Sequence, residues 1–311
     1  MSKKHLQNII AESRHTLPIA ILYGIGIWLL AGVVQHHWWV QFLCFFASVY
    51  GMIHLNNINM LIRIYSRAVS VSYLVLACTT VWLFPSVFGA LIQVCSVLML
   101  LLLFACYQDT GTTGKTFYIF LLLSLVSLTD PHFLLFLPVI YLLMATTVYS
   151  LSFRTFVASL LGLVTPYWFY TGWQMFWHID QPSLAVAYLS RFNEMQWNPS
   201  NTSLTHSQMS YFILLVVLFV VGAIHFWLTS YMDKIRVRNI YTSLNLLAIY
   251  CIILMAVQPH KYNLWIYVLT ITASPVIAHY VALTRSKISN IFVLTAIVAI
   301  LLLTGYNLWI S

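Results

Sequence analysis

Charged side chains are scarce in this sequence. Asp, Glu, Lys and Arg make up 6% of its 311 residues, whereas hydrophobic residues make up 61%. A soluble domain usually carries about a quarter charged residues, because water must hydrate its surface. Such a small charged fraction excludes a water-soluble globular surface, so lipid must cover much of the protein. We therefore predict an all-α, polytopic integral membrane protein, typical of a bacterial inner membrane.

Acidic residues are especially few, and the chain has only six. No acidic or basic residue lies near the centre of a predicted membrane span. Coupled transporters and proton pumps commonly carry such groups as relays, so their absence disfavours an ion-driven transporter. Three acids lie in predicted cytoplasmic segments beside basic residues and are interpreted as solvated loop charges: Glu12, Asp109 and Asp233.

The five cysteines contain no CxxC pair, and all lie in or beside apolar runs. This pattern favours buried free thiols over metal or redox chemistry. Histidines gather near the outer ends of several spans, but no HxxxH or HxxE spacing is present. We therefore predict no metal ion and no cofactor.

Apolar runs long enough to span a membrane, about 17–25 residues, recur along the whole chain. Soluble tails and linkers are nearly absent, so residues 1–311 are predicted to form a single transmembrane domain, with its longest outer loop at about 179–207. The first run is too long for the apolar core of a signal peptide and is interpreted as an uncleaved span. We place eleven spans at about 16–34, 39–55, 68–84, 87–106, 117–129, 132–149, 155–178, 209–230, 242–257, 264–284 and 291–309.

Basic residues segregate strongly across these spans. With a cytoplasmic N-terminus, 12 of the 14 Lys and Arg residues fall in cytoplasmic segments, and only Arg191 and Lys261 fall outside. Cytoplasmic loops of membrane proteins carry an excess of Lys and Arg. The pattern therefore predicts that the N-terminus is cytoplasmic and the C-terminus is outside. It also explains the net charge of +8 without a nucleic-acid partner.

Two spans are irregular. The fifth offers only the residues from Phe117 to Thr129 before Asp130-Pro131, about 20 Å of helix against a hydrocarbon core of about 30 Å. Asp130 is interpreted either as the N-cap of the next helix or as a carboxylate in a recess beside His132, where it would act as a base or hold a cation. In the seventh span, small residues and Pro166 share one face, which predicts close approach of a neighbouring helix and a kink.

Aromatic residues crowd the outer side of the seventh span. Interfacial aromatic belts explain most such rings, yet the run from Pro166 to Tyr170 faces all round its helix. Some of these rings are therefore expected to face protein, stacking on a sugar or cradling an isoprenoid chain. On the inner side, the loop from Asn56 to Arg67 carries two arginines among apolar residues. It is interpreted as an ordinary basic loop or as an interfacial segment that recognises anionic headgroups.

Two stretches, LIRIYSRAVSVSYLVLAC from Leu61 and the run from Thr116 to Phe169, resemble a family of Bacteroidota polytopic inner-membrane proteins of unknown function. The second is also similar to membrane-embedded C-type glycosyltransferases, which use polyprenyl-linked sugars. The similarity rests on Asp130 with Pro131, Leu137 with Pro138, Arg154, and Leu160 to Pro166. Those enzymes place a catalytic acid in the first outer loop, where this chain has His36 and His37 and no acid. The resemblance thus implies a lipid-linked sugar substrate but leaves catalysis open.

The first functional hypothesis is therefore a protein that binds or processes a polyprenyl-linked or other lipid or sugar substrate at the outer face. Asp130 and His132 are the predicted catalytic pair. The predicted substrate-binding residues are His36, His37, Trp168, Trp173, Trp177, His178 and Asp180. Two alternatives stay open: a transporter or flippase of a neutral or amphipathic solute, and a non-enzymatic subunit of an envelope complex. The expected partners are membrane lipids, polyprenyl-phosphate-linked sugar and an envelope protein.

Overall fold

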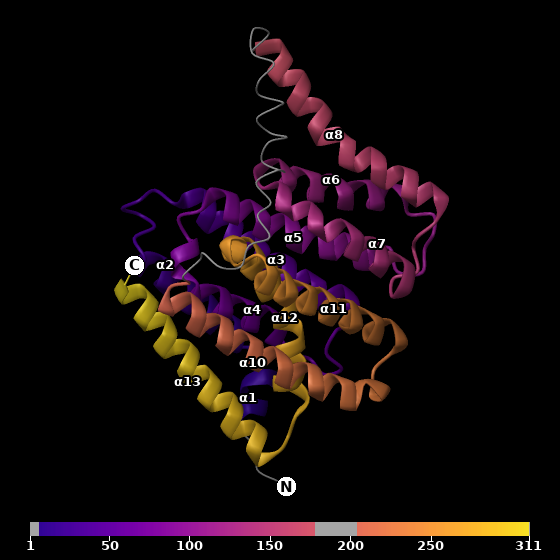
Figure 1. The fold of residues 1–311 in the computed structure, drawn as a ribbon. Helices are drawn as coiled ribbons and strands as arrows, with labels where there is room; N and C mark the ends of the chain where they lie inside the picture. The colour runs from indigo at the N-terminus through magenta and orange to yellow at the C-terminus, as the bar shows by residue number, and fades with distance from the viewer. Residues whose placement is uncertain (1–5, 178–203, 311) are drawn as a thin grey trace. The chain divides into compact units, whose positions relative to one another are not determined.

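The computed structural model describes residues 6–177 and 204–310, and these residues are all-α with no strand among them. They form two compact units of helices (Figure 1). Unit 1 comprises residues 1–94, 202–252 and 262–311, and unit 2 comprises residues 95–201 and 253–261. Each unit is described by itself below.

Unit 1 is built around two buried helices, α4 and α12. Helix α12 carries apolar or small residues on all sides, and nearly its whole length is buried, as expected for a helix that is hydrophobic all round. Helix α4 packs on α2, α3, α12 and α13. The elements of unit 1 are α1 (Leu6–Glu12), α2 (Thr16–Leu30), α3 (Trp39–Asn59), α4 (Ala68–Thr79), η1 (Val81–Leu83), α10 (His206–Thr229), η4 (Ser230–Met232), α12 (Tyr262–Leu283), α13 (Lys287–Ile310) and the first parts of α5 (Val87–Ala105) and α11 (Ile235–Val257).

Helix α1 was not expected from the sequence, because it is short and only partly apolar. Buried Gln7 holds it in place: its Nε2 donates to the Val281 carbonyl at 2.7 Å, and its backbone N–H donates to Asn290 Oδ1 at 3.0 Å. Helix α1 therefore lies beside the start of α13, whose 24 residues extend about 36 Å to the C-terminal end (Figure 1). Helix α1 and the last described residue, Ile310, thus lie at opposite ends of α13.

Unit 2 is organised by the pairing of α6 (Thr113–Thr129) with α8 (Phe153–Trp177). A Cβ added to Gly162 on α8 would lie 2.4 Å from the Phe117 carbonyl oxygen on α6, so the backbones touch. This confirms the predicted small-residue face. Ser124 Oγ also donates across the pair to the Leu163 carbonyl at 2.7 Å. The remaining elements are η2 (Pro131–Leu135), α7 (Phe136–Thr146), η5 (Pro259–Lys261), the last part of α5 and the end of α11.

Each of the eleven predicted spans overlaps a helix of the structure. Five helical segments in the described part of the chain are long and apolar enough to cross a membrane: Val87–Ala105, His206–Met232, Ile235–Val257, Pro259–Leu283 and Lys287–Ile310. Other apolar helices are shorter, at 10–17 residues. Helix α6 begins at Thr113, four residues before the predicted span, which lengthens it to 17 residues. The structure thus shows a helical protein with segments long and apolar enough to span a membrane, while the number of crossings and their direction stay predictions.

Candidate functional site

Asp130 stands in the break between α6 and η2. Its backbone is extended, with φ −141° and ψ 110°, and Pro131 follows at the first helical position. Its carboxylate Oδ1 accepts from the backbone N–H of His132 at 3.1 Å. This is the N-cap arrangement, so the structure confirms the interpretation of Asp130 as the N-cap of the next helix. The cap begins a short 3-10 turn that leads into α7.

The same carboxylate holds two further side chains. The Nδ1–H of His132 donates to Oδ1 at 2.7 Å, and Lys261 Nζ on η5 donates to Oδ2 at 2.7 Å. The His132 ring also meets the ring of His260 edge to face, with 5.7 Å between centroids. We call Asp130, His132, His260 and Lys261 the Asp130 cluster, and all four belong to unit 2.

The electrostatics of the cluster keep Asp130 ionised. Burial opposes ionisation, since the Asp130 side chain is only 21% exposed. Hydrogen bonds from His132 and Lys261, together with the charge of Lys261, outweigh burial and lower the pKa of Asp130 to about 2. A carboxylate with that pKa is a weak proton acceptor at neutral pH. Asp130 is therefore better suited to orienting its neighbours and accepting hydrogen bonds than to acting as a base.

His132 has one nitrogen with a fixed role. Because the carboxylate can only accept, Nδ1 must carry the proton, which leaves Nε2 as an acceptor in the neutral ring. His132 is buried, and Nε2 has no hydrogen-bond partner among the described residues. A buried polar atom without a partner is unfavourable, so this atom is the chemically unsatisfied point of the cluster.

An apolar groove of about 480 Å³ lies between α6 and α8, within unit 2. Its α6 wall is formed by leucines on one helical face, and the last of them, Leu128, precedes Asp130 by two residues. Its α8 wall includes the helix-breaking Pro166 and three aromatic rings. The lining residues are Leu121, Leu125, Leu128, Thr165, Pro166, Phe169, Tyr170 and Trp173.

The predicted tryptophans separate in the structure. Trp173 lines the α6–α8 groove, whereas Trp168 does not and is 73% exposed. Trp177 is the last residue of α8, and its side chain lies outside the described part of the chain. His178 and Asp180 also lie outside the described residues. Of the two predicted stacking rings whose side chains the structure describes, Trp168 and Trp173, only Trp173 lines the groove.

His36 and His37 belong to unit 1, in the turn between α2 and α3. Both are exposed. The His36 ring stacks on Trp38 at 4.7 Å between centroids, and His37 adopts a left-handed backbone with φ 57°. Their predicted grouping with Asp130, which lies in unit 2, stays a prediction.

The interpretation of Asp233 as a solvated loop charge was wrong. Its side chain is fully buried, and its two oxygens meet Arg63 Nε at 3.0 Å and His279 Nε2 at 3.1 Å. A buried carboxylate needs such partners to stay charged. Loop position and neighbouring basic residues gave no sign of this burial. The one available signal was His279, a histidine in the inner part of an apolar span.

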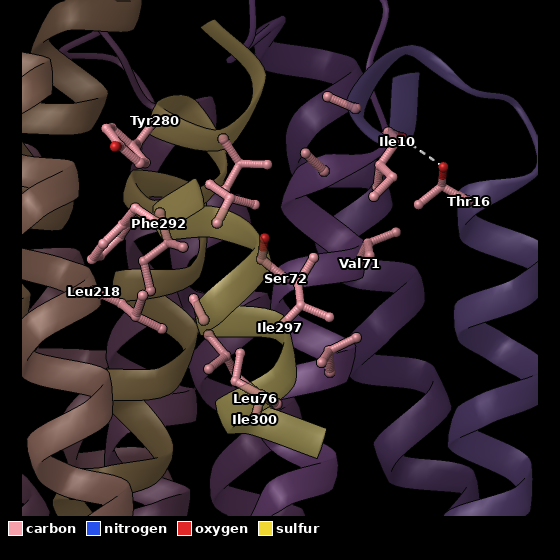
Figure 2. Close-up of a pocket in the computed structure, with 17 residues that line it drawn as sticks. Ile10, Thr16, Val71, Ser72, Leu76, Leu218, Tyr280, Phe292, Ile297 and Ile300 are labelled. Atoms are coloured by element: carbon pink, nitrogen blue, oxygen red, sulfur yellow. Dashed lines mark hydrogen bonds between the residues drawn. The ribbon is translucent and has the colours of Figure 1, made fainter. Parts of the chain in front are cut away.

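Unit 1 also contains an apolar cavity of about 110 Å³ between α1, the start of α2, α4, α10, α12 and α13. In Figure 2, Leu218, Phe292 and Tyr280 lie on one side of it and Val71 and Ile10 on the other. Its few polar lining residues include Thr16, whose hydroxyl is already donated to the Ile10 carbonyl at 2.6 Å. The cavity is thus suited to apolar atoms.

Among the described residues, no group of three or more His, Cys, Asp or Glu side chains is placed to hold a metal ion. Comparison with models of protein families, with curated proteins and with solved structures finds no match to this chain. The resemblances to the Bacteroidota membrane family and to C-type glycosyltransferases therefore stay predictions.

Proposed function

We propose that this multi-pass membrane protein binds a lipid-linked sugar, with the lipid chain in the α6–α8 groove and the sugar at the Asp130 cluster. One observation carries the proposal. The Asp130 carboxylate is fixed by three hydrogen bonds and is still partly exposed, and it follows by two residues Leu128, which lines an apolar groove.

The cluster suits a neutral, hydroxyl-bearing head. The charges of Asp130 and Lys261 cancel across a 2.7 Å pair, so little net charge is left to attract a phosphate. An ionised carboxylate offers about four acceptor sites, and three are used here. Because Asp130 is held in one orientation, a sugar hydroxyl can donate to the remaining site with little further ordering of the protein.

The groove suits an isoprenoid chain. From Leu121 to Leu128 its α6 wall extends about 10 Å, and the aromatic rings of Phe169, Tyr170 and Trp173 face it from α8. Flat rings bury a large area with little loss of conformational freedom. Pro166 removes one backbone hydrogen bond from α8 and interrupts its regular surface at the groove.

The geometry supports binding more strongly than catalysis. Asp130 is a weak base, and the acceptor atom of His132 is buried. If the sugar is also processed, the proton acceptor is His132 Nε2, oriented through Nδ1 by Asp130. Neighbouring side chains must then move to expose Nε2 when the sugar binds.

The first test is mass spectrometry of the lipids that remain bound to the gently purified protein. Stoichiometric lipid-linked sugar is expected in the unchanged protein. Retention of bulk phospholipid alone contradicts the proposal and directs the search to a transported solute or an envelope protein partner.

Matched variants locate the site. Asp130→Asn and Trp173→Ala are expected to lose the bound lipid. Asp109→Asn changes an exposed loop carboxylate of the same unit, and Trp168→Ala removes an exposed ring on the same helix outside the groove. Both controls are expected to retain the lipid. Equal losses in a variant and its control would place the lipid elsewhere.

A further inference from the structure

A second polar site lies in unit 1, where the chain leaves α3 and where α11 begins. It is a pocket of about 370 Å³ between the segment after α3 and the start of α11. We call it the cationic pocket. It is lined by Asn56, Asn57, Met60, Ile62, Arg63, Ile64, Tyr65, Ser66, Arg67, Asp233, Lys234 and Val237.

Positive charge exceeds negative charge in this lining. Three cations, Arg63, Arg67 and Lys234, face one carboxylate, Asp233, which leaves a formal charge of +2. Arg63 uses Nε on Asp233, and Arg67 uses Nη1 on Asn57 Oδ1 at 3.0 Å. Within the described part of the chain, Lys234 Nζ and the terminal nitrogens of Arg63 have no partner. The pocket therefore offers several unused donors to an anion.

The pocket is preformed by contacts at its base. Helix α3 ends in a left-handed residue, Met60 with φ 48°, which turns the chain back. Ser66 Oγ then donates to the Ala11 carbonyl at 2.7 Å, and Asn56 Nδ2 donates to the Ser66 carbonyl at 3.0 Å. Buried Asp233 holds Arg63 in place through an ion pair with its Nε. Because the donors are already positioned, binding costs little additional ordering.

Exposed apolar side chains around the pocket, which we call its rim, favour a lipid over free phosphate as the source of the anion. Large hydrophobic side chains on the two segments, Ile58, Met60, Tyr65 and Ile235, are exposed. The Arg67 guanidinium lies 5.4 Å from the centroid of the Tyr65 ring. Exposed apolar groups around basic residues are typical of a surface at the level of lipid headgroups. A site for a free phosphate in water needs no such rim.

The apolar cavity of unit 1 adds a second argument for a lipid. Arg67 lines the cationic pocket, and the next residue, Ala68, lines the apolar cavity. The linings of a polar and an apolar site thus meet at consecutive residues. A phospholipid presents the same pairing of chemistries, an anionic head joined to acyl chains.

We propose that the cationic pocket binds the phosphate of an anionic phospholipid headgroup. Arg67 and Lys234 supply charge and hydrogen bonds, and Arg63 supplies its terminal nitrogens. Asp233 acts as a positioning residue, because its ion pair with Arg63 Nε holds the guanidinium and leaves the terminal nitrogens available to the ligand. This site is separate in sequence and in chemistry from the Asp130 cluster.

The test is native mass spectrometry of the full chain in detergent, titrated with phosphatidylglycerol and, separately, with zwitterionic phosphatidylcholine. Phosphatidylglycerol is expected to bind more tightly. Each Lys or Arg near a membrane surface contributes about 1 kcal/mol to anionic-lipid attraction, so Arg67→Gln/Lys234→Gln should weaken phosphatidylglycerol binding about thirty-fold. The matched control, Arg285→Gln/Lys287→Gln, removes two exposed cations of the same unit outside the pocket and should leave binding nearly unchanged.

Three results would overturn the proposal. Equal weakening in the control pair would show general surface attraction. Equal affinity for the two lipids would show that the negative charge of the headgroup does not contribute to binding. Displacement of phosphatidylglycerol by a large excess of inorganic phosphate would show a site for free phosphate. If the double variant fails to fold, exposed Lys234→Gln alone is measured, with about five-fold weaker binding expected and unchanged binding contradicting the proposal.

Discussion

The contact between α6 and α8 allows a sharp test, because the groove depends on it. In Gly162→Ala the new Cβ would lie 2.4 Å from the Phe117 carbonyl oxygen, whereas ordinary contact begins at 3.4 Å. The helices must therefore separate by about 1 Å. The obstacle is backbone, which cannot rotate away as a side chain can, so the cost falls near the upper end of the about 1–3 kcal/mol typical of overpacking.

Helix propensity opposes this cost, since Ala is favoured over Gly by about 1 kcal/mol in a helix. The net loss in the free energy of unfolding is then about 2 kcal/mol, a decrease in melting temperature of about 4–8 °C. Gly172→Ala is the matched control on the same helix, because its added Cβ meets no atom within 4 Å. It should melt at the same temperature as the unchanged protein or slightly higher.

A thiol-reactive dye can follow this unfolding. Cys78, Cys95, Cys106 and Cys251 are buried in the folded chain and become reactive when it opens. Gly162→Ala should also lose the lipid proposed for the groove, since separation of the helices changes its width. Melting of Gly162→Ala at or above the temperature of Gly172→Ala would refute the close contact and the reasoning built on it.

Two further predictions concern the ion pairs. The pKa of Asp130 is lowered to about 2 from 3.8, so its hydrogen bonds from His132 and its pairing with Lys261 together add about 2 kcal/mol of stability, which is fully present above about pH 4 and lost as pH falls toward 2. The melting temperatures of the unchanged protein and of Asp130→Asn should therefore converge at low pH, and a gap that does not change with pH contradicts the pairing. Arg63→Gln leaves the buried Asp233 carboxylate without its cation and should destabilise the protein by up to about 3 kcal/mol. Arg238→Gln, at an exposed position of the same unit, should change stability little. An equal loss of stability in both variants would show that the ion pair of Arg63 with Asp233 does not stabilise the protein.

The ion pairs also bear on the predicted topology. Lys261 and Asp130 were both assigned to the outer side from the charge pattern, and the structure joins them at 2.7 Å. Arg63 and Asp233 were both assigned to the inner side and meet at 3.0 Å. Residues on opposite sides of a membrane cannot form such contacts, so each pair is compatible with the predicted assignment. Which side faces the cytoplasm stays a prediction.

The sequence by itself determined the local features. Apolar run length predicted the positions of the helices, because a helix that meets lipid must satisfy its backbone internally and show apolar side chains. Asp130-Pro131 predicted a helix start, since both residues act through the backbone beside them. The small-residue face at Gly162 predicted a close helix contact for the same reason: a missing Cβ is a local property.

Only the tertiary structure decided which side chains meet. Lys261 pairs with Asp130 across 131 residues, and nothing near either residue in the sequence indicates the other. Asp233 resembles a solvated loop acid until packing buries it against Arg63 and His279. Trp168 and Trp173 are alike in sequence, but α8 places only Trp173 in the groove. Burial and pairing depend on how distant helices pack, and helix packing is settled by the whole set of contacts at once rather than by any one segment.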